Sequence, residues 1–158
     1  MMDNDFVAIT RKLYEYALGI DTRDWDLYRR IFCDEITADF RSYDGGTHAT
    51  LAADDWVAGL KVQFAGLDAT QHVMSNPVVD IDGDTARCRM YMKAEHFLQN
   101  SSGSADFAIG GYYDDRLIRG DAGWLIESVT LNVFWSRGNR GIMTLASDIG
   151  ASRLSLGA

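Results

Sequence analysis

Two residues of this sequence are best suited to proton transfer: Asp21, which follows the first amphipathic segment, and His72, which begins an expected strand. Imidazole has an unperturbed pKa of about 6.5, so it can accept a proton near neutral pH. A carboxylate bonded to one ring nitrogen fixes the tautomer and leaves the lone pair of the other nitrogen free. If the fold brings Asp21 and His72 together, the pair is suited to removing a proton from carbon.

A second histidine, His96, ends a run in which apolar and polar residues alternate as they do on the two faces of a strand. Its apolar face consists of Cys88, Met90, Met92, Ala94 and His96. His72 is expected to share a strand face with Thr70, Met74 and Asn76. Histidines on such faces are more often hydrogen-bonded core residues than catalysts. The residues alone therefore leave both interpretations open for His72 and His96.

Two histidines that point inward from neighbouring strands also suggest a metal site. A zinc site needs three protein ligands, commonly with regular spacing, and the sequence contains no HxxxH or CxxC motif. It also lacks the nucleophile elbow, the phosphate-binding loop and the glycine motif of dinucleotide-binding proteins. We therefore predict that the protein uses neither a metal nor a cofactor, and that Cys33 and Cys88 are buried, reduced thiols.

Helical periodicity predicts the elements that position Asp21. Apolar residues recur every three or four positions in the first twenty residues, which indicates a helix that ends beside Gly19. Asp21 then lies in the hinge before a second helix. It could be the N-cap of that helix, either alongside a role in proton transfer or instead of one, and Asp54 is the expected N-cap of a third helix. The predicted elements are helices over residues 6–20, 22–32 and 54–66, and a strand over residues 36–43.

The rest of the chain is typical of long antiparallel strands. Asp82-Gly83 separates two strand-like runs and indicates a hairpin, because glycine accepts a positive φ. A second hairpin is expected near residues 120–123, and Gly110-Gly111 predicts a bulge or bend in its first strand. Residues 137–158 are expected to be a tail that is ordered only if it docks, so we predict a single domain over residues 1–136.

Composition limits the partners of such a domain. The chain has 158 residues, of which 47% are hydrophobic, so one compact core is expected. Its formal net charge of -8 argues against nucleic acid or an anionic membrane as partner, which leaves a small apolar molecule. The sequence shows neither a leader-like N-terminus nor a long apolar run, so a cytoplasmic location is expected. Aromatic and branched residues on both faces of residues 124–135 predict a homodimer or homotrimer.

Several short motifs, taken in order, resemble one known family. They are Tyr14-Glu15-Tyr16-Ala17, Asp21-Thr22-Arg23-Asp24-Trp25-Asp26, Asp39-Phe40-Arg41-Ser42-Tyr43, Thr70-Gln71-His72, Ile109-Gly110-Gly111 and Gly123-Trp124. Together they resemble the SnoaL-like and scytalone dehydratase-like branch of the NTF2-like superfamily. The last two also resemble hexachlorocyclohexane dehydrochlorinase of that branch. The likeness covers residues 5–136 in order and spacing, and the order carries it because each motif is short.

The resemblance implies an α+β cone, in which a curved, mostly antiparallel sheet surrounds an apolar cavity. Three helices from the N-terminal half of the chain would close its mouth. Members of this branch that eliminate water or hydrogen chloride use an aspartate and a histidine, and Asp21 and His72 fall at those positions. His96 falls at the second histidine of the dehydratase pattern. The resemblance therefore implies catalytic roles for Asp21, His72 and His96.

Aromatic and methionine side chains are expected to line such a cavity and to hold a ring-like apolar substrate. The predicted substrate-binding residues are Tyr16, Phe40, Trp56, Met74, Met90, Met92, Phe107 and Tyr112. Ile20 and Phe40 stand where scytalone dehydratase has paired tyrosines, so dehydration of scytalone itself is not expected. The candidates for a replacement phenol are Tyr14, Tyr16, Tyr43, Tyr112 and Tyr113.

The sequence therefore predicts a cofactor-independent lyase of dehydratase type, or an isomerase, that acts on a small apolar cyclic oxygenated molecule. His72 would be the general base, Asp21 would orient it, and His96 would assist a leaving group or a carbonyl. The alternative is a noncatalytic module of the same fold that binds a small ligand or assembles with other subunits. In that case Asp21 and His72 would be buried but not coupled, and side chains would fill the cavity.

Overall fold

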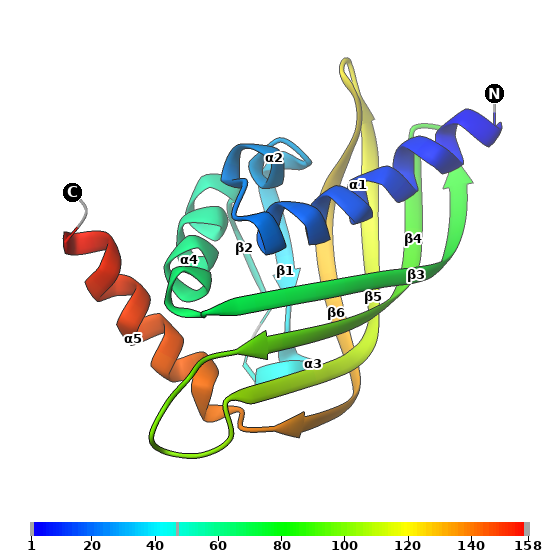
Figure 1. Cartoon of the computed structure of the whole chain (residues 1–158). Coiled ribbons are helices and arrows are strands. Elements are labelled where there is room, and N and C mark those ends of the chain that lie inside the picture. Colours follow the sequence, from blue (N-terminus) through cyan, green and yellow to red (C-terminus); the bar gives the residue numbers. More distant parts are fainter. Residues whose placement is uncertain (1, 47, 157–158) are drawn as a thin grey trace.

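The computed structural model describes residues 2–46 and 48–156 of the chain (Figure 1). Within these residues, six strands form one sheet in the order β2-β1-β6-β5-β4-β3. The strands are β1 Phe32–Asp39, β2 Ala49–Ala52, β3 Ala69–Asp82, β4 Thr85–Phe97, β5 Asp106–Gly120 and β6 Gly123–Gly138. The helices are α1 Met2–Thr22, α2 Trp25–Arg29, α3 Arg41–Asp44, α4 Ala53–Gly66 and α5 Gly141–Leu156. This arrangement confirms the predicted α+β fold class.

The sheet is antiparallel except where β1 pairs with β6, which are parallel. Its strands bend strongly, and α1 lies across one side of the curved sheet (Figure 1). Both predicted hairpins are confirmed, and Gly83 has the positive φ of 58° that its turn requires. The pairing of β5 with β6 changes register between Gly110 and Gly111, which confirms the predicted irregularity there.

The inward face of β3 changes partway along the strand. The β3–β4 register shifts between Ser75 and Val78, and Asn76 has a positive φ of 55°. A bulge adds a residue to one strand and so inverts the alternation beyond it. The predicted face of Thr70, His72, Met74 and Asn76 was therefore wrong at its last member, because Asn76 is exposed.

The end of α1 differs from the predicted hinge. The helix continues through Gly19 to Thr22, so Asp21 lies in its last turn and not between two helices. Arg23, with a φ of 57°, then turns the chain. The N-cap of α2 is Asp24, whose Oδ1 accepts a hydrogen bond from the Leu27 backbone nitrogen at 2.9 Å. Asp21 is therefore not the N-cap of α2, and its carboxylate is free to contact another element.

Three other predicted boundaries need correction. The second helix stops at Arg29, and Cys33, predicted to be helical and buried, lies partly exposed in β1. The first strand ends at Asp39, so Phe40 precedes the short helix α3. The third helix begins at Ala53, so Asp54 lies in its first turn and does not cap it. An acidic side chain there still interacts favourably with the positive end of the helix dipole.

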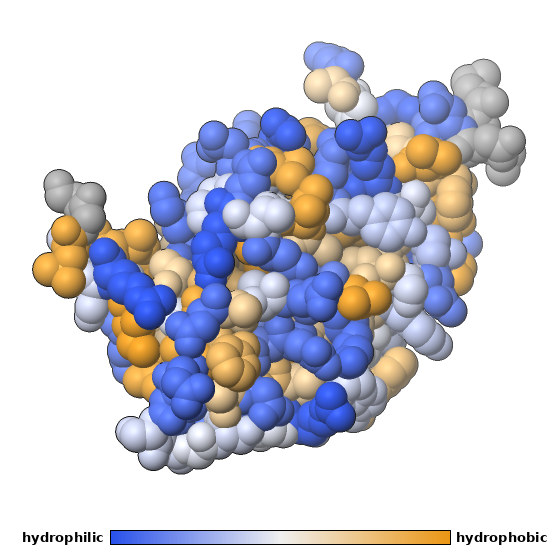
Figure 2. All heavy atoms as spheres, viewed as in Figure 1, coloured by the Kyte–Doolittle hydropathy of each residue, from blue (hydrophilic) through white to orange (hydrophobic). Residues whose placement is uncertain are grey.

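Most of the segment predicted as a tail belongs to regular elements. Residues up to Gly138 complete β6, and Gly141–Leu156 form α5, which lies beside α4 (Figure 1). The last two residues, 157–158, lie outside the described residues. On the face viewed in Figure 2, hydrophobic atoms gather around the outer side of α5. One side of α5 packs against α4, and the other side is exposed.

Glycines allow α4 and α5 to approach closely. A Cβ atom added to Gly66 of α4 would lie 1.8 Å from the backbone oxygen of Ala146 in α5. A Cβ atom added to Gly150 of α5 would lie 1.8 Å from the backbone oxygen of Val62 in α4. The two helix backbones are therefore in direct contact, which larger residues at these positions would prevent.

Over the ranges that the structure covers, no helix is both long and apolar enough to cross a membrane.

Candidate active site

The carboxylate of Asp21 holds His72 through two hydrogen bonds. The ring Nδ1 of His72 donates to Asp21 Oδ1 at 2.7 Å, and the backbone nitrogen of His72 donates to Asp21 Oδ2 at 2.6 Å. The side chain of His72 is only 5% exposed. Because Nδ1 carries the proton, Nε2 has its lone pair free. The two residues are coupled, in the geometry that orients a histidine as a general base.

Local structure explains why these residues meet. The buried stripe of α1 packs this helix against the sheet, and β3 runs beside the helix. The stripe consists of Ile9, Leu13, Tyr16, Ala17 and Ile20. Asp21 follows this stripe directly, at the end of the helix, where it reaches the edge strand β3. Alternation along β3 points His72 inward, towards the same helix.

His72 borders a cavity of about 350 Å³ inside the curved sheet. Its lining is mainly apolar and aromatic, and α4, β1, β5 and β6 contribute to it along with α1. The lining residues used below are Tyr16, Phe40, Trp56, Phe64, His72, Met92, His96, Tyr113 and Met143. A cavity of this size suits a molecule of one or two fused rings. Side chains therefore do not fill the space in front of His72.

His96 lies next to His72 in the cavity wall, with 5.6 Å between the ring centroids. Thr70 Oγ1 is hydrogen bonded to Nδ1 of His96 at 2.8 Å. Burial, and to a smaller extent the charge of His72, lowers the pKa of His96 to about 3. His96 is therefore neutral at physiological pH. It can donate or accept a hydrogen bond, but it does not act as a positively charged acid.

The low pKa of His96 makes folding stability sensitive to acid. The unfolded chain binds a proton at His96 with a pKa near the ordinary 6.5, whereas the folded chain binds it near 3, so stability falls as pH decreases between these values. We expect His96→Gln to lose less unfolding free energy than the parent protein between pH about 6.5 and about 4. Urea unfolding at several pH values measures this. Parallel curves for the two proteins would contradict it.

Aromatic contacts fix the orientation of both histidines. The ring of Phe64 lies 6.1 Å from that of His72 and 5.9 Å from that of His96, measured between centroids. His96 also stacks on Phe107, with an interplanar angle of 23°. Neither imidazole can rotate freely without displacing these rings.

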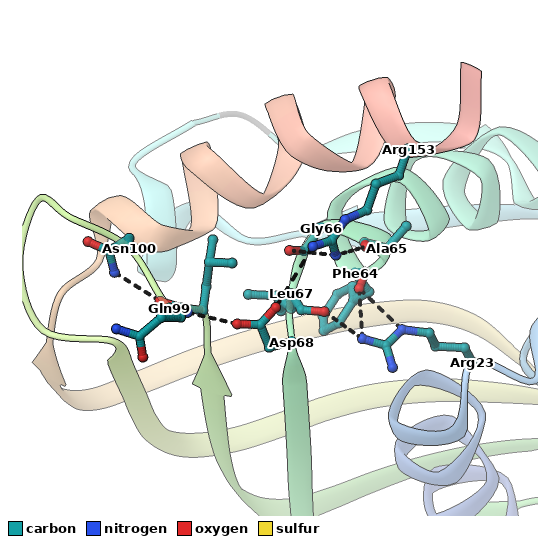
Figure 3. A network of polar contacts seen from close by, with 10 residues as sticks. Arg23, Phe64, Ala65, Gly66, Leu67, Asp68, Gln99, Asn100 and Arg153 are labelled. Carbon is teal, nitrogen blue, oxygen red and sulfur yellow. Dashed lines mark hydrogen bonds and ion pairs between the residues drawn. The ribbon is translucent and has the colours of Figure 1, made fainter. Parts of the chain in front are cut away.

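Two arginines hold the end of α4, and with it Phe64 (Figure 3). Arg23 Nη2 donates hydrogen bonds to the carbonyl oxygens of Leu67 at 2.8 Å and Phe64 at 3.2 Å. Arg153 of α5 donates to the carbonyl oxygen of Ala65 at 2.9 Å. The last carbonyls of a helix have no partner within the helix, so the guanidinium groups satisfy them. The end of α1 and the end of α5 thereby support the same wall of the cavity.

The structure brings some of the predicted substrate-binding residues to the cavity and places others elsewhere. Tyr16, Phe40, Trp56 and Met92 line it. Met74 instead borders a smaller recess beside Asp21. The remaining predicted residues lie outside the lining, since Met90 and Phe107 are in the core behind it and Tyr112 is on the outer face of β5.

Tyr113, and not Tyr112, faces the cavity. Tyr112 packs against Phe134 on the outer face, with ring centroids 5.4 Å apart, because adjacent residues of a strand point to opposite faces. The prediction that Tyr112 lines the cavity was wrong for this reason. Alternation along β5 predicts the correct residue. Tyr113 lies an even number of positions from the buried residues Phe107 and Leu117, so all three side chains point to the same face.

Among the described residues, no three side chains of His, Cys, Asp or Glu gather closely enough to hold a metal ion. The polar partners of His72 and His96 are the carboxylate of Asp21 and the hydroxyl group of Thr70. Groups of this kind can transfer protons and form hydrogen bonds.

Comparison with known sequences identifies relatives over most of the chain. A family model described as the SnoaL-like domain matches residues 4–130. An uncharacterized protein of Mycobacterium tuberculosis is 27% identical over 123 residues, which are 78% of this chain and 81% of that protein. The scytalone dehydratase of Colletotrichum orbiculare is 23% identical over 97 residues, which are 61% of this chain and 40% of that protein.

Solved structures show the same fold. The Kfla4162 protein of Kribbella flavida superposes with a TM-score of 0.87 at 30% identity, covering 91% of this chain and 99% of that one. A hexachlorocyclohexane dehydrochlorinase of Novosphingobium barchaimii superposes with a TM-score of 0.68 at 16% identity, covering 85% and 90% of the two chains. These findings confirm the resemblance predicted from the sequence.

Proposed function

Because this chain belongs to the SnoaL-like family, we propose that it is a cofactor-independent lyase of dehydratase type, or a related isomerase, acting on a small apolar cyclic oxygenated molecule. The observation that carries this proposal is the hydrogen bond of 2.7 Å between Asp21 and Nδ1 of His72, with the ring facing a cavity of about 350 Å³. This arrangement provides an oriented base in front of an apolar space that can hold a ring.

In the proposed reaction, Nε2 of His72 removes a proton from a carbon atom next to the carbon that bears a hydroxyl group. The electrons of the broken C–H bond form a carbon–carbon double bond as the C–O bond breaks. The departing hydroxide takes the proton from the imidazolium of His72 and leaves as water, so the base returns to its starting state. Asp21 stabilises the imidazolium that forms between these steps.

His96 assists the departing oxygen by hydrogen bonding. Its ring is neutral because burial holds its pKa at about 3. A neutral imidazole can donate its N–H to the oxygen without transferring the proton, and it does not repel the imidazolium of His72 as a second cation would. The hydrogen bond between Thr70 and Nδ1 keeps His96 in the wall of the cavity.

The names of two relatives support the elimination of a small group from carbon. Scytalone dehydratase is named for the removal of water, and hexachlorocyclohexane dehydrochlorinase for the removal of hydrogen chloride from a cyclohexane. The coupling of Asp21 to His72 favours this function over a noncatalytic binding module, which would need the cavity but not an oriented imidazole.

Proton removal from a ring carbon can be tested without knowing the natural substrate. A cyclic ketone with acidic C–H bonds, such as β-tetralone, is incubated with the protein in deuterium oxide, and deuterium incorporation is followed by NMR. We expect exchange above the buffer rate, increasing with protein concentration. A set of cyclic hydroxy ketones is then followed by the ultraviolet absorbance of the conjugated product. Exchange at the buffer rate for every compound would argue against the proposal.

A further inference from the structure

Arg23 has a backbone conformation that is unusual for arginine. It follows the last residue of α1 with a φ of 57°, in the left-handed region. A helix that ends in this conformation usually has glycine there, because a side chain adds strain. Strained residues persist where the surrounding contacts require them, and they are frequent at functional sites. The contacts of the Arg23 side chain therefore have to offset the strain of its backbone.

The guanidinium group of Arg23 reaches the end of α4 (Figure 3). Its Nε and Nη2 donate hydrogen bonds to the carbonyl oxygen of Phe64 at 3.3 and 3.2 Å, and Nη2 also donates to that of Leu67 at 2.8 Å. Phe64 belongs to the last turn of α4, and Leu67 is the C-cap that precedes β3. A planar guanidinium with several donors can hold two such acceptors at once. One side chain therefore fixes both the end of α4 and the beginning of β3.

The two segments that Arg23 holds are the ones that orient the imidazoles. Helix α4 contributes the buried ring of Phe64, which lies 6.1 Å from the ring of His72 and 5.9 Å from that of His96. Strand β3 contributes His72 itself and Thr70, whose hydroxyl group is bonded to Nδ1 of His96. A displacement of the last turn of α4 would therefore change the packing of both imidazoles.

Arg23 is also close in sequence to the acid that holds His72. Asp21, two residues earlier, accepts hydrogen bonds from the ring and the backbone of His72. The backbone nitrogen of Arg23 donates to the carbonyl oxygen of Ile20 at 3.1 Å and closes the last turn of α1. The same short segment thus carries the carboxylate that binds the base and the guanidinium that fixes the ring beside it.

We propose that Arg23 is a positioning residue of the active site: by joining the end of α1 to the end of α4, it sets the direction in which His72 presents Nε2 to the cavity. Arg23 lies outside the described lining of the cavity, so it acts through Phe64 and β3. Its effect on catalysis rests on the proposed function. A misplacement of about 1 Å can lower the rate of such a step about 100-fold.

Replacing Arg23 by Gly separates positioning from stability. Glycine removes the guanidinium group but adopts the left-handed conformation without strain, so the two effects oppose each other and the thermal unfolding midpoint should change little. We expect the ring-proton NMR signals of His72 and His96 to shift, because the ring of Phe64 moves relative to both. Deuterium exchange into β-tetralone should fall about ten- to a hundred-fold. His72→Ala and His96→Gln assign the two signals.

The matched control is Arg30→Gly, the same substitution at the exposed arginine that follows α2. Both imidazole signals and the exchange rate should keep their parental values in this variant, because surface changes have small effects. Arg23→Lys keeps a donor but lacks the planar fork that reaches two carbonyl groups. It should therefore shift the signals less than Arg23→Gly does, and it decides the question if the glycine variant does not fold.

Unshifted imidazole signals in the folded variant at position 23 would overturn the inference. Parental exchange by that variant would overturn it as well, provided that the parent protein exchanges ketone protons. The test is separate from the proposed reaction: a parent protein without exchange loses the lyase, whereas the imidazole spectra still decide whether Arg23 positions His72 and His96.

Discussion

Replacing His72 by Ala is expected to lower deuterium exchange into β-tetralone to the buffer rate. A positioned general base contributes about 10²- to 10⁴-fold to such a step, and no other imidazole in the described cavity wall is held by a carboxylate. The rate of exchange, measured by NMR at fixed protein concentration, checks this. His48→Ala is the control, because His48 is an exposed histidine outside the cavity lining and should leave the rate unchanged.

Asp21→Asn should also reduce the exchange rate, by about 10²- to 10⁴-fold, while the ring of His72 remains present. An amide can offer its N–H to Nδ1, which favours the tautomer whose proton lies on Nε2 and leaves no lone pair towards the cavity. Near-parental exchange in folded His72→Ala would show that another group removes the proton. Near-parental exchange in folded Asp21→Asn would show that His72 does not need the carboxylate.

Gly66→Ala is expected to have the largest effect on stability, about 3 kcal/mol or more. The added Cβ atom would lie 1.8 Å from the backbone oxygen of Ala146, so the helices must separate. Because Met143 of α5 lines the cavity, the site should loosen as well. Urea unfolding followed by circular dichroism measures the loss, and limited proteolysis reports whether α5 detaches.

Gly59→Ala on the same helix is the matched control. A Cβ atom at Gly59 has nothing within 4 Å, and alanine favours helix over glycine by about 1 kcal/mol. This variant should therefore be as stable as the parent or slightly more stable. Equal stabilities for Gly66→Ala and Gly59→Ala would mean that the contact between α4 and α5 contributes little to the fold.

The inward direction of His72 and His96 follows from alternation, a local property that needs only neighbouring residues. The meeting of Asp21 with His72 is different. Fifty-one positions separate them, and no local pattern brings the end of a helix to an edge strand. Only the resemblance to a known family placed them together. The sequence-based location of Asp21 in a hinge was wrong because helix α1 runs past Gly19, which faces Tyr28 closely rather than ending the helix.

The parts of the cavity wall that were missed depend on contacts between distant elements. Residues 141–156 contain several glycines and serines, which have low helix propensity, so an isolated segment of this composition predicts a tail. Contact with α4 at Gly66 and Gly150 stabilises the helix, and Met143 then reaches the cavity. The bulge at Asn76 likewise becomes visible only when β3 is paired with β4.

The parallel pairing of β1 with β6 also determines when the cavity can form during synthesis. Residues 32–39 leave the ribosome long before residues 123–138, and β2 is their partner in the sheet until then. Closing so long a loop carries an entropic cost that only the completed β5–β6 hairpin can offset. A nascent chain that ends at residue 120 would contain Asp21, His72 and His96 but would lack one wall of the cavity. Proton exchange into β-tetralone should therefore appear only after β6 has been synthesised.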